Sequence, residues 1–257
     1  MRHHLFLLRE LVKRDVQSRY AGSWLGLLWS FVQPLWMLLL YTFVFSAVLK
    51  IKLPDELRTD NFAAFLFCGL LPWMAIQEGV SRAATVVTDN AALVKKLRFP
   101  AEILVLSVVV AALIHEAIAG AIFLVALAVT GELAWPGLPL LLLALPLQVA
   151  LTLGLGLLLG SVHVFFRDIA QVLGMVLTGW FYLTPIVYPL TMVPAPLQPW
   201  IAWNPLTGLV ELYRQALLGG ELSLVPGMAG LAVAALVLLF AGSRIFARLK
   251  ASFPDEI

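Results

Sequence analysis

The chain has 257 residues, of which 61% are hydrophobic and only 12% are charged. Soluble domains have roughly 45–50% apolar and about 25% charged residues, so this composition excludes an ordinary soluble protein and indicates an integral membrane protein. The one cysteine, Cys68, excludes a disulfide framework and a thiolate metal site. We expect no cleavable signal, because the apolar patch at residues 5–8 is too short for the apolar core of a signal peptide.

The first predicted element is an amphipathic segment over residues 1–23. Leu5, Leu8, Val12 and Val16 fall at helical spacing, and cationic side chains occupy another face. This pattern is typical of a helix that lies in the membrane interface. A soluble surface helix would show the same pattern, but the apolar run that follows at once favours the interface.

Six apolar stretches follow, and each has about the 20 residues that a helix needs to cross the hydrocarbon core. Their leucine and alanine content and their lack of two-residue alternation favour helices over a barrel. We therefore predict an all-α integral membrane protein with a single transmembrane domain over 1–257, in which the spans cover about 24–49, 62–80, 101–130, 138–163, 170–188 and 226–246.

Helix breakers and small residues add detail to these spans. Pro34, Pro72 and Pro185 are expected to kink the first, second and fifth spans, as proline does inside packed membrane helices. GxxxG spacing at 22–26 and at 156–160 is compatible with close helix contact, although this motif is common in glycine-rich apolar sequences.

The distribution of charge predicts the orientation of the spans. Thirteen of the 17 Lys and Arg residues precede the first span, follow the last, or lie in the connections after the second and fourth spans. Cytoplasmic connections carry the excess of Lys and Arg, so this side is predicted to be the cytoplasm, with both termini on it. The remaining four, which include Arg214, are assigned to the external side.

A short cytoplasmic helix is predicted at 89–99, between the second and third spans. Asp89 or Asn90 can cap its start, basic residues fall in its last turn, and Pro100 ends it. Its apolar side is suited either to anionic lipid headgroups or to another protein.

Ionisable residues inside the spans are the first place to look for chemistry. His115 and Glu116 lie near the middle of the third span, where ionisable groups are costly and often functional. The alternative is a protonated Glu116 that is hydrogen-bonded to a neighbouring helix. The four histidines form no metal-binding pattern, no acidic cluster is present, and no lysine follows a glycine as in a phosphate-binding loop. We therefore expect no catalytic residue and no metal site in this chain.

Aromatic side chains in the spans suggest a path for sugars, because aromatic faces stack against sugar rings. Bundle packing and an interfacial aromatic belt are the alternative explanations. The candidates for the substrate path are Trp29, Gln33, Trp36, Tyr41, Trp180, Tyr182 and Tyr188.

Two short external helices are predicted at 195–219. Asn204 is a suitable N-cap, Pro205 suits the first helical position, and Gly219 follows the end of a helix of about 14 residues, which is too short to span. Such helices are re-entrant or interfacial, and we expect them to gate the path. The candidate gate residues are Trp200, Trp203, Asn204, Pro205, Glu211, Tyr213 and Arg214, of which Glu211 and Arg214 can pair.

Several separate motifs carry a resemblance to one family. The first stretch contains R-D-x-x-x-R-Y, then L-G-x-L-W and Q-P, at Arg14, Asp15, Arg19, Tyr20, Leu25, Gly26, Leu28, Trp29, Gln33 and Pro34. It resembles the permease subunit of ABC-2 type exporters, and most closely the branch that exports O-antigen. The block at 90–100 resembles the coupling helix of that family, and the block at 165–168 resembles the end of its fourth span. The blocks at 188–189 and 204–214 both resemble its external gate region.

The resemblance implies partners and a function. The family is homodimeric, works with two ATPase subunits that bind ATP and Mg²⁺, and moves a lipid-linked polysaccharide across the bacterial inner membrane. This chain would then need no cofactor of its own and no nucleic acid. The residues expected to contact the ATPase are Asn90, Leu93, Lys95, Lys96, Leu97, Arg98 and Phe99.

Other functions remain open at this point. The same motifs occur in capsule and teichoic-acid exporters, so the polymer is not decided. An ABC-2 exporter of drugs or small lipids would be expected to have fewer aromatics along its path. A membrane-embedded transferase is disfavoured, because it would need the acidic or histidine cluster that the sequence lacks.

Overall fold

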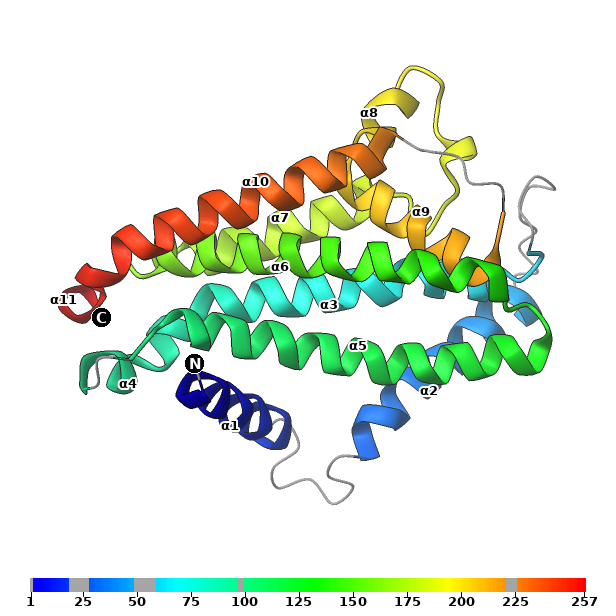
Figure 1. The fold of residues 1–257 in the computed structure, drawn as a ribbon. Coiled ribbons are helices and arrows are strands. Elements are labelled where there is room, and N and C mark those ends of the chain that lie inside the picture. Colours follow the sequence, from blue (N-terminus) through cyan, green and yellow to red (C-terminus); the bar gives the residue numbers. More distant parts are fainter. Residues whose placement is uncertain (1, 19–27, 49–58, 97–98, 221–225) are drawn as a thin grey trace.

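The body of the protein is formed by long helices that run side by side (Figure 1). The computed structural model describes residues 2–18, 28–48, 59–96, 99–220 and 226–257. Within these described residues, four segments are long and apolar enough to cross a membrane. They are α3 (Phe62–Asp89), α5 (Glu102–Thr130), η3 (Trp135–Leu140) with α6 (Leu141–His163), and α10 (Pro226–Leu249) with its C-terminal continuation. These helices confirm the predicted all-α membrane class.

Shorter elements surround these four. Two are apolar, namely α2 (Trp29–Tyr41), which continues into the π-helix η2 (Thr42–Val48), and α7 (Ile169–Leu183). At one end of the bundle lie α1 (Arg2–Ser18), α4 (Ala91–Lys96), η5 (Lys250–Ser252) and α11 (Phe253–Glu256); at the other lie η4 (Leu190–Met192), α8 (Gln198–Ala202) and α9 (Pro205–Leu218) (Figure 1).

Two helices do not end where the corresponding spans were predicted to end. The second span was predicted to cover about 62–80, and α3 continues as a helix to Asp89. The fifth was predicted to cover about 170–188, and α7 ends at Leu183, with Thr184 extended. Pro185 therefore follows the helix instead of kinking it. Residues 24–27 of the first span lie outside the described residues.

A side-chain network fixes the start of α3. The side chain of Asn61 accepts hydrogen bonds from the backbone N–H groups of Ala63 and Ala64, which satisfies donors at the first turn. The Asn61 amide and the Thr59 hydroxyl also donate to the carboxylate of Glu132, at 3.1 and 3.0 Å. The beginning of α3 is thereby tied to the end of α5.

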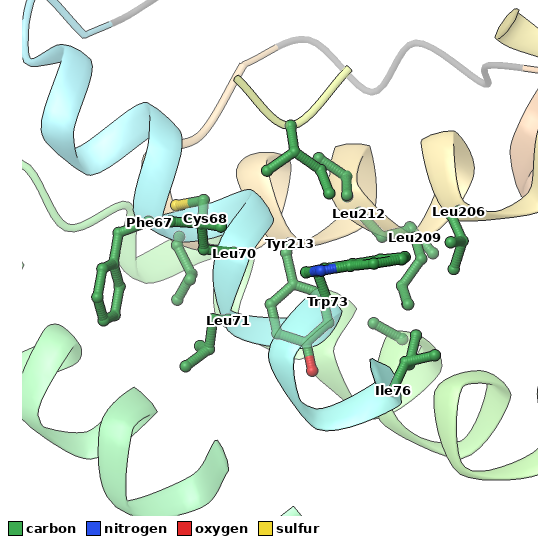
Figure 2. Close-up of a cluster of buried hydrophobic side chains, with 14 of the residues drawn as sticks. Phe67, Cys68, Leu70, Leu71, Trp73, Ile76, Leu206, Leu209, Leu212 and Tyr213 are labelled. Atoms are coloured by element: carbon green, nitrogen blue, oxygen red, sulfur yellow. The ribbon is translucent and has the colours of Figure 1, made fainter. Parts of the chain in front are cut away.

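Helix α9 is buried on nearly every side. All of its residues from Leu206 to Leu218 are buried except Glu211. Figure 2 shows side chains of α9, such as Leu209 and Tyr213, beside Trp73 and other residues of α3. The predicted short helix is confirmed, with Asn204 as its cap, and it lies in the protein core, with nearly all of its residues buried rather than those of one apolar face.

Glycines allow α6 to approach its neighbours closely. A Cβ on Gly160 would lie 2.6 Å from the Ala83 carbonyl oxygen of α3, and one on Gly156 would lie 2.8 Å from the Ala83 Cβ. On another face of α6, a Cβ on Gly154 would lie 2.5 Å from the Leu238 carbonyl carbon of α10. The GxxxG spacing at 156–160 thus marks a real helix contact, whereas the one at 22–26 lies outside the described residues.

This packing predicts that Gly160→Ala destabilises the protein. Backbone atoms of α3 would have to move to admit the added methyl group, and overpacking of this kind costs about 1–3 kcal/mol. Thermal unfolding of the purified protein in detergent measures the effect as a lower melting temperature. Gly174→Ala is the matched control, because a Cβ there meets nothing within 4 Å. Equal melting temperatures for the two variants would contradict the close contact.

Candidate functional site

A cavity of about 340 Å³ lies between α2, α3 and α5. Its walls are mostly apolar, with contributions from side chains such as Phe67 and Leu71. The polar groups that reach it belong to Ser30, Gln33, Glu78, His115 and Glu116. Two of the predicted path residues, Gln33 and Trp36, therefore line a real cavity, and they share it with the ionisable residues of the third predicted span.

The remaining predicted path residues lie elsewhere. Helix α2 packs against α3 and α5, whereas α7 packs against α3 and α6. The structure does not bring the aromatics of α2 and α7 into one site within the chain. Trp36 and Tyr182 are each 64% exposed, and Trp29 is also exposed.

Three predicted path residues have local structural contacts. The Trp180 indole N–H donates to the side-chain oxygen of Asn204 at 3.0 Å. The Tyr188 hydroxyl donates to the Tyr182 carbonyl oxygen at 2.7 Å, and Tyr41 packs near Phe45. These contacts are within the chain, and among the candidate path residues Trp29, Trp36 and Tyr182 are the aromatics that are exposed.

Glu116 takes part in a closed ring of three buried side chains from three helices. Its Oε1 lies 2.7 Å from the Tyr213 hydroxyl of α9, and its Oε2 accepts from the Gln148 amide of α6 at 2.6 Å. The Tyr213 hydroxyl also lies 2.6 Å from Gln148 Oε1. The ring joins the short helix α9 to two long helices.

The ring closes only if Glu116 carries a hydrogen. A phenol has one hydrogen, and the Gln148 amide nitrogen supplies a hydrogen to only one of the three contacts. Three contacts need three hydrogens, so the third belongs to the Glu116 carboxyl. Exchanging the oxygen and nitrogen of the Gln148 amide leaves the count unchanged. The sequence-based alternative, a protonated Glu116 bonded to neighbouring helices, is therefore the one that this geometry favours.

His115 lies beside a different carboxylate. Its Nδ1 is 3.5 Å from Glu78 of α3, and both of these residues line the cavity. Glu78 also lies 3.4 Å from Arg82, and Arg82 forms an ion pair with Asp15 of α1. A series of neighbouring ionisable side chains therefore connects His115 and Glu78, at the cavity, through Arg82 to Asp15 of α1.

Four of the candidate gate residues, Trp200, Trp203, Asn204 and Pro205, lie at or just before the beginning of α9. Asn204 caps the helix through its side-chain oxygen, and its amide donates to the Thr184 hydroxyl at 3.0 Å. Pro205 occupies the first helical position. Trp200 and Trp203 are exposed, as residues of an interfacial belt would be. The Asn204 side chain thus connects the start of α9 to Thr184 and, through the Trp180 indole, to α7.

Arg214, which the charge distribution assigned to an external connection, is a buried residue of α9. Its guanidinium lies 3.5 Å from the centre of the Phe65 ring and donates to the Ile186 carbonyl oxygen at 2.9 Å. The predicted pair with Glu211 is present at 3.9 Å. A buried guanidinium needs such partners, because an uncompensated buried charge is strongly destabilising.

Within the predicted coupling helix at 89–99, α4 covers Ala91–Lys96, Asp89 belongs to α3, and residues 97–98 lie outside the described residues. The predicted side-chain capping was wrong. The Asn90 side chain donates to the Val86 carbonyl oxygen and accepts from Arg14, while Asp89 accepts from Thr85. The backbone carbonyl of Asn90 accepts the N–H groups at the start of α4 instead.

The side chains predicted to contact an ATPase have different surroundings. Leu93 and Phe99 pack partly against a core cluster of this chain that contains Val94, which leaves less of each for a partner. Lys95 is exposed. Leu97, Arg98 and the Lys96 side chain lie outside the described residues.

Sequence reasoning missed the partners of the ionisable groups. Gln148 was not selected, although a lone amide within an apolar run is a visible signal. Glu78 and Arg82 are four residues apart on α3, where i,i+4 charge pairs are common. Their connection to Asp15 has no local signal, since 67 residues separate Asp15 from Arg82.

The chain is similar in sequence to a known protein family and to several named proteins. Residues 7–218 match the family described as ABC-2 type transporter. The chain is 33% identical over 255 residues to the O-antigen export system permease protein RfbA of Myxococcus xanthus, covering 98% of this chain and 95% of that protein. It is 30% identical over 253 residues to a protein of the same name from Klebsiella pneumoniae, covering 97% and 94%. It is 26% identical over 237 residues to the polysialic acid transport protein KpsM of Escherichia coli, covering 92% and 90%.

The ring predicts an infrared signature and a stability effect. We expect the protein at neutral pH to show the C=O stretching band of a buried carboxylic acid, and we expect Glu116→Gln to remove it. Tyr213→Phe should shift the band, because the carboxyl loses its hydrogen-bond partner. It should also lower the free energy of unfolding by about 1–3 kcal/mol, the usual cost of leaving buried polar groups unpaired.

Two variants serve as controls for this measurement. Glu211→Gln changes a carboxyl group outside the ring and should leave the band in place. Tyr182→Phe removes an exposed hydroxyl and should leave stability within about 0.5 kcal/mol of the parent. A spectrum without any carboxylic-acid band that depends on Glu116 would show that the group is ionised.

Proposed function

Because the chain belongs to the ABC-2 type transporter family, we propose that it is the membrane subunit of an exporter that moves a lipid-linked polysaccharide of the O-antigen class across the bacterial inner membrane. The observation that carries the proposal is the similarity to two O-antigen export permeases over nearly the whole length of both chains. The identity is lower for the polysialic acid transport protein, which makes capsule export the second candidate. A permease of this kind is a transporter subunit and not an enzyme.

The proposed topology has six spans with both termini in the cytoplasm. The four long helices would form four of the spans, and the two shorter apolar helices, α2 with η2 and α7, would form the other two. Both ends of the chain lie at the end of the bundle where α4 and α11 are found, and α8 and α9 lie at the opposite end (Figure 1). The charge distribution assigns the first of these ends to the cytoplasm.

We also propose that the permease acts as a homodimer. The exposed aromatics of α2 and α7, Trp36 and Tyr182, do not enclose a path within one chain. Large exposed apolar side chains on both helices are suited to contact with a second copy or with lipid. Two protomers would place four aromatic-bearing helices around a shared path for the sugar chain.

Helices α8 and α9 would close this path on the external side. Helix α9 is held by the ring at Glu116, by Arg214 and by the Asn204 cap, which are hydrogen-bonding arrangements that can break and re-form. Opening would require α9 to shift relative to α5 and α6. The gate is thus connected to the middle of the bundle.

Energy would enter through a separate ATPase that binds ATP and Mg²⁺. The proposed contact is the exposed side of α4, where Lys95 projects. Arg14 of α1 bonds to Asn90 beside α4 at 3.1 Å, and Asp15 pairs with Arg82 of α3. A displacement of α4 would therefore carry α1 and α3 with it, because charge-assisted bonds connect all three helices.

The proposed function predicts that deleting the gene abolishes surface polysaccharide in the source bacterium. Polymer should accumulate inside the cell on its lipid carrier, because synthesis continues without an exit route. Immunoblots of intact and lysed cells measure the two pools, and restoring the gene is the control. Unchanged surface polymer in the deletion strain would refute the proposal.

The proposed coupling predicts that Lys95→Glu weakens the association with the ATPase. A reversed charge at an interface rim alters charge complementarity, and we expect a loss of roughly tenfold in affinity. Co-purification of the ATPase with tagged permease measures it. Arg244→Glu makes the same change on an exposed site of α10 and should leave the complex intact. Equal recovery of the ATPase with both variants would contradict docking at α4.

A further inference from the structure

We propose that Phe253 of α11 is a positioning residue for the ATPase contact: its buried ring holds α4 in place against the end of α10. This inference rests on the proposed function, because it specifies how the chain holds the helix to which the ATPase would bind. Helices α4 and α11 lie at the same end of the bundle, although they are far apart in the sequence (Figure 1).

Helix α4 depends on other parts of the chain for its stability. It covers Ala91–Lys96, and a helix of six residues is far shorter than the roughly 12–15 residues at which an isolated helix becomes even marginally stable in water. Its side chains divide into two faces, since Ala92 and Lys95 are exposed whereas Val94 is buried. The buried face must therefore stabilise the helix, while the exposed face remains available to a partner.

Phe253 belongs to the same buried apolar cluster as Val94. Helix α11 packs against α4, and within α11 the Phe253 side chain is fully buried, whereas Pro254, Asp255 and Glu256 are exposed. Leu93 of α4 packs against this cluster as well. The apolar support of the proposed coupling helix thus includes an aromatic ring from a remote part of the sequence.

The ring of Phe253 is itself held by a firmly packed helix. It lies edge-to-face with Phe246 of α10, with ring centres 5.2 Å apart, and its centre is 6.4 Å from that of Phe165, both within the range of favourable aromatic pairs. Helix α10 packs closely on α6, since a Cβ on Gly242 would lie 2.3 Å from the Gly154 carbonyl oxygen. Through Phe253, α4 is therefore attached to a rigid part of the bundle.

An ion pair beside α11 cannot replace this packing. The Lys250 ammonium of η5 lies 2.5 Å from the carboxylate of Glu102, in the first turn of α5, which follows α4 along the chain. The two side chains are 45% and 35% exposed, and exposed ion pairs contribute little to stability. The buried ring is therefore the stronger of the two connections.

Removal of the ring would release α4 from its position. Phe253→Ala leaves a cavity in the cluster, and α4 would then occupy its bound-state position for only part of the time. A partner that binds the correctly placed helix loses apparent affinity in proportion to that fraction. Phe253 would thus affect the ATPase without contacting it.

The test measures the order of α4 and the binding of the ATPase with the same purified proteins. In Phe253→Ala we expect hydrogen exchange of the peptide that covers 91–96 to become faster by roughly tenfold, because its packing partner is lost. We expect the affinity of the permease for the ATPase to fall by roughly tenfold as well, since a helix in place for a tenth of the time binds a tenth as well. Hydrogen exchange with mass spectrometry and a binding titration give the two values.

Three further variants make the test specific. Phe123→Ala is the matched control, because it removes an equally buried ring that packs on Phe67 in a different cluster, and it should change neither value. Phe253→Leu keeps an apolar side chain in the cluster and should restore most of the protection and affinity. Val94→Ala removes packing from the α4 side and should change both values in the same direction by roughly threefold, even if Phe253→Ala fails to fold.

The results separate the role of Phe253 from the proposed function. Faster exchange and weaker binding in Phe253→Ala, both absent in Phe123→Ala and largely reversed in Phe253→Leu, support the inference. Unchanged exchange at α4, faster exchange without loss of affinity, or equal losses in Phe123→Ala overturn it. If the parent binds the ATPase and Phe253→Ala binds equally well, only the role of Phe253 fails. If the parent permease does not bind the ATPase, the proposed function fails and the inference fails with it.

Discussion

A helix of 14 residues that ends inside a membrane protein depends on partners for its polar groups, and this constraint organises the structure. Asn204 satisfies donors at the start of α9, and Arg214 lies buried on Phe65 with its guanidinium bonded to Ile186. Tyr213 anchors the helix to Glu116 and Gln148. Because lipid offers no hydrogen bonds, α9 can occupy this place only while those bonds are made.

Helix α3 connects this buried region with the opposite end of the molecule. It packs against α5, α6, α7 and α9, and it is the most buried of the four long helices. At one end Asn61 and Thr59 tie it to Glu132, and near the other Arg82 binds Asp15. Motion that enters beside α4 would therefore reach the neighbourhood of α9 along one continuous element, without a separate chain of contacts.

The cavity beside α3 brings together polar groups from three helices. Glu116 lines it and is also a member of the ring that holds Tyr213 of α9. The cavity is therefore adjacent to the carboxyl group that anchors α9. His115 and Glu116 are neighbours in the sequence, but His115 lies beside Glu78, whereas Glu116 contacts Tyr213 and Gln148.

The sequence by itself determined the helical membrane class, most helix positions, and the cap and first turn of α9, because apolar run length and local backbone chemistry are encoded in consecutive residues. Only the tertiary structure decided which partner each buried polar group has. Glu116 meets Gln148 across 32 residues and Tyr213 across 97, and no local pattern encodes either distance. For the same reason the sequence did not indicate that Arg214 is buried, because the burial of its guanidinium depends on Phe65 and Ile186, which only the packed bundle brings beside it.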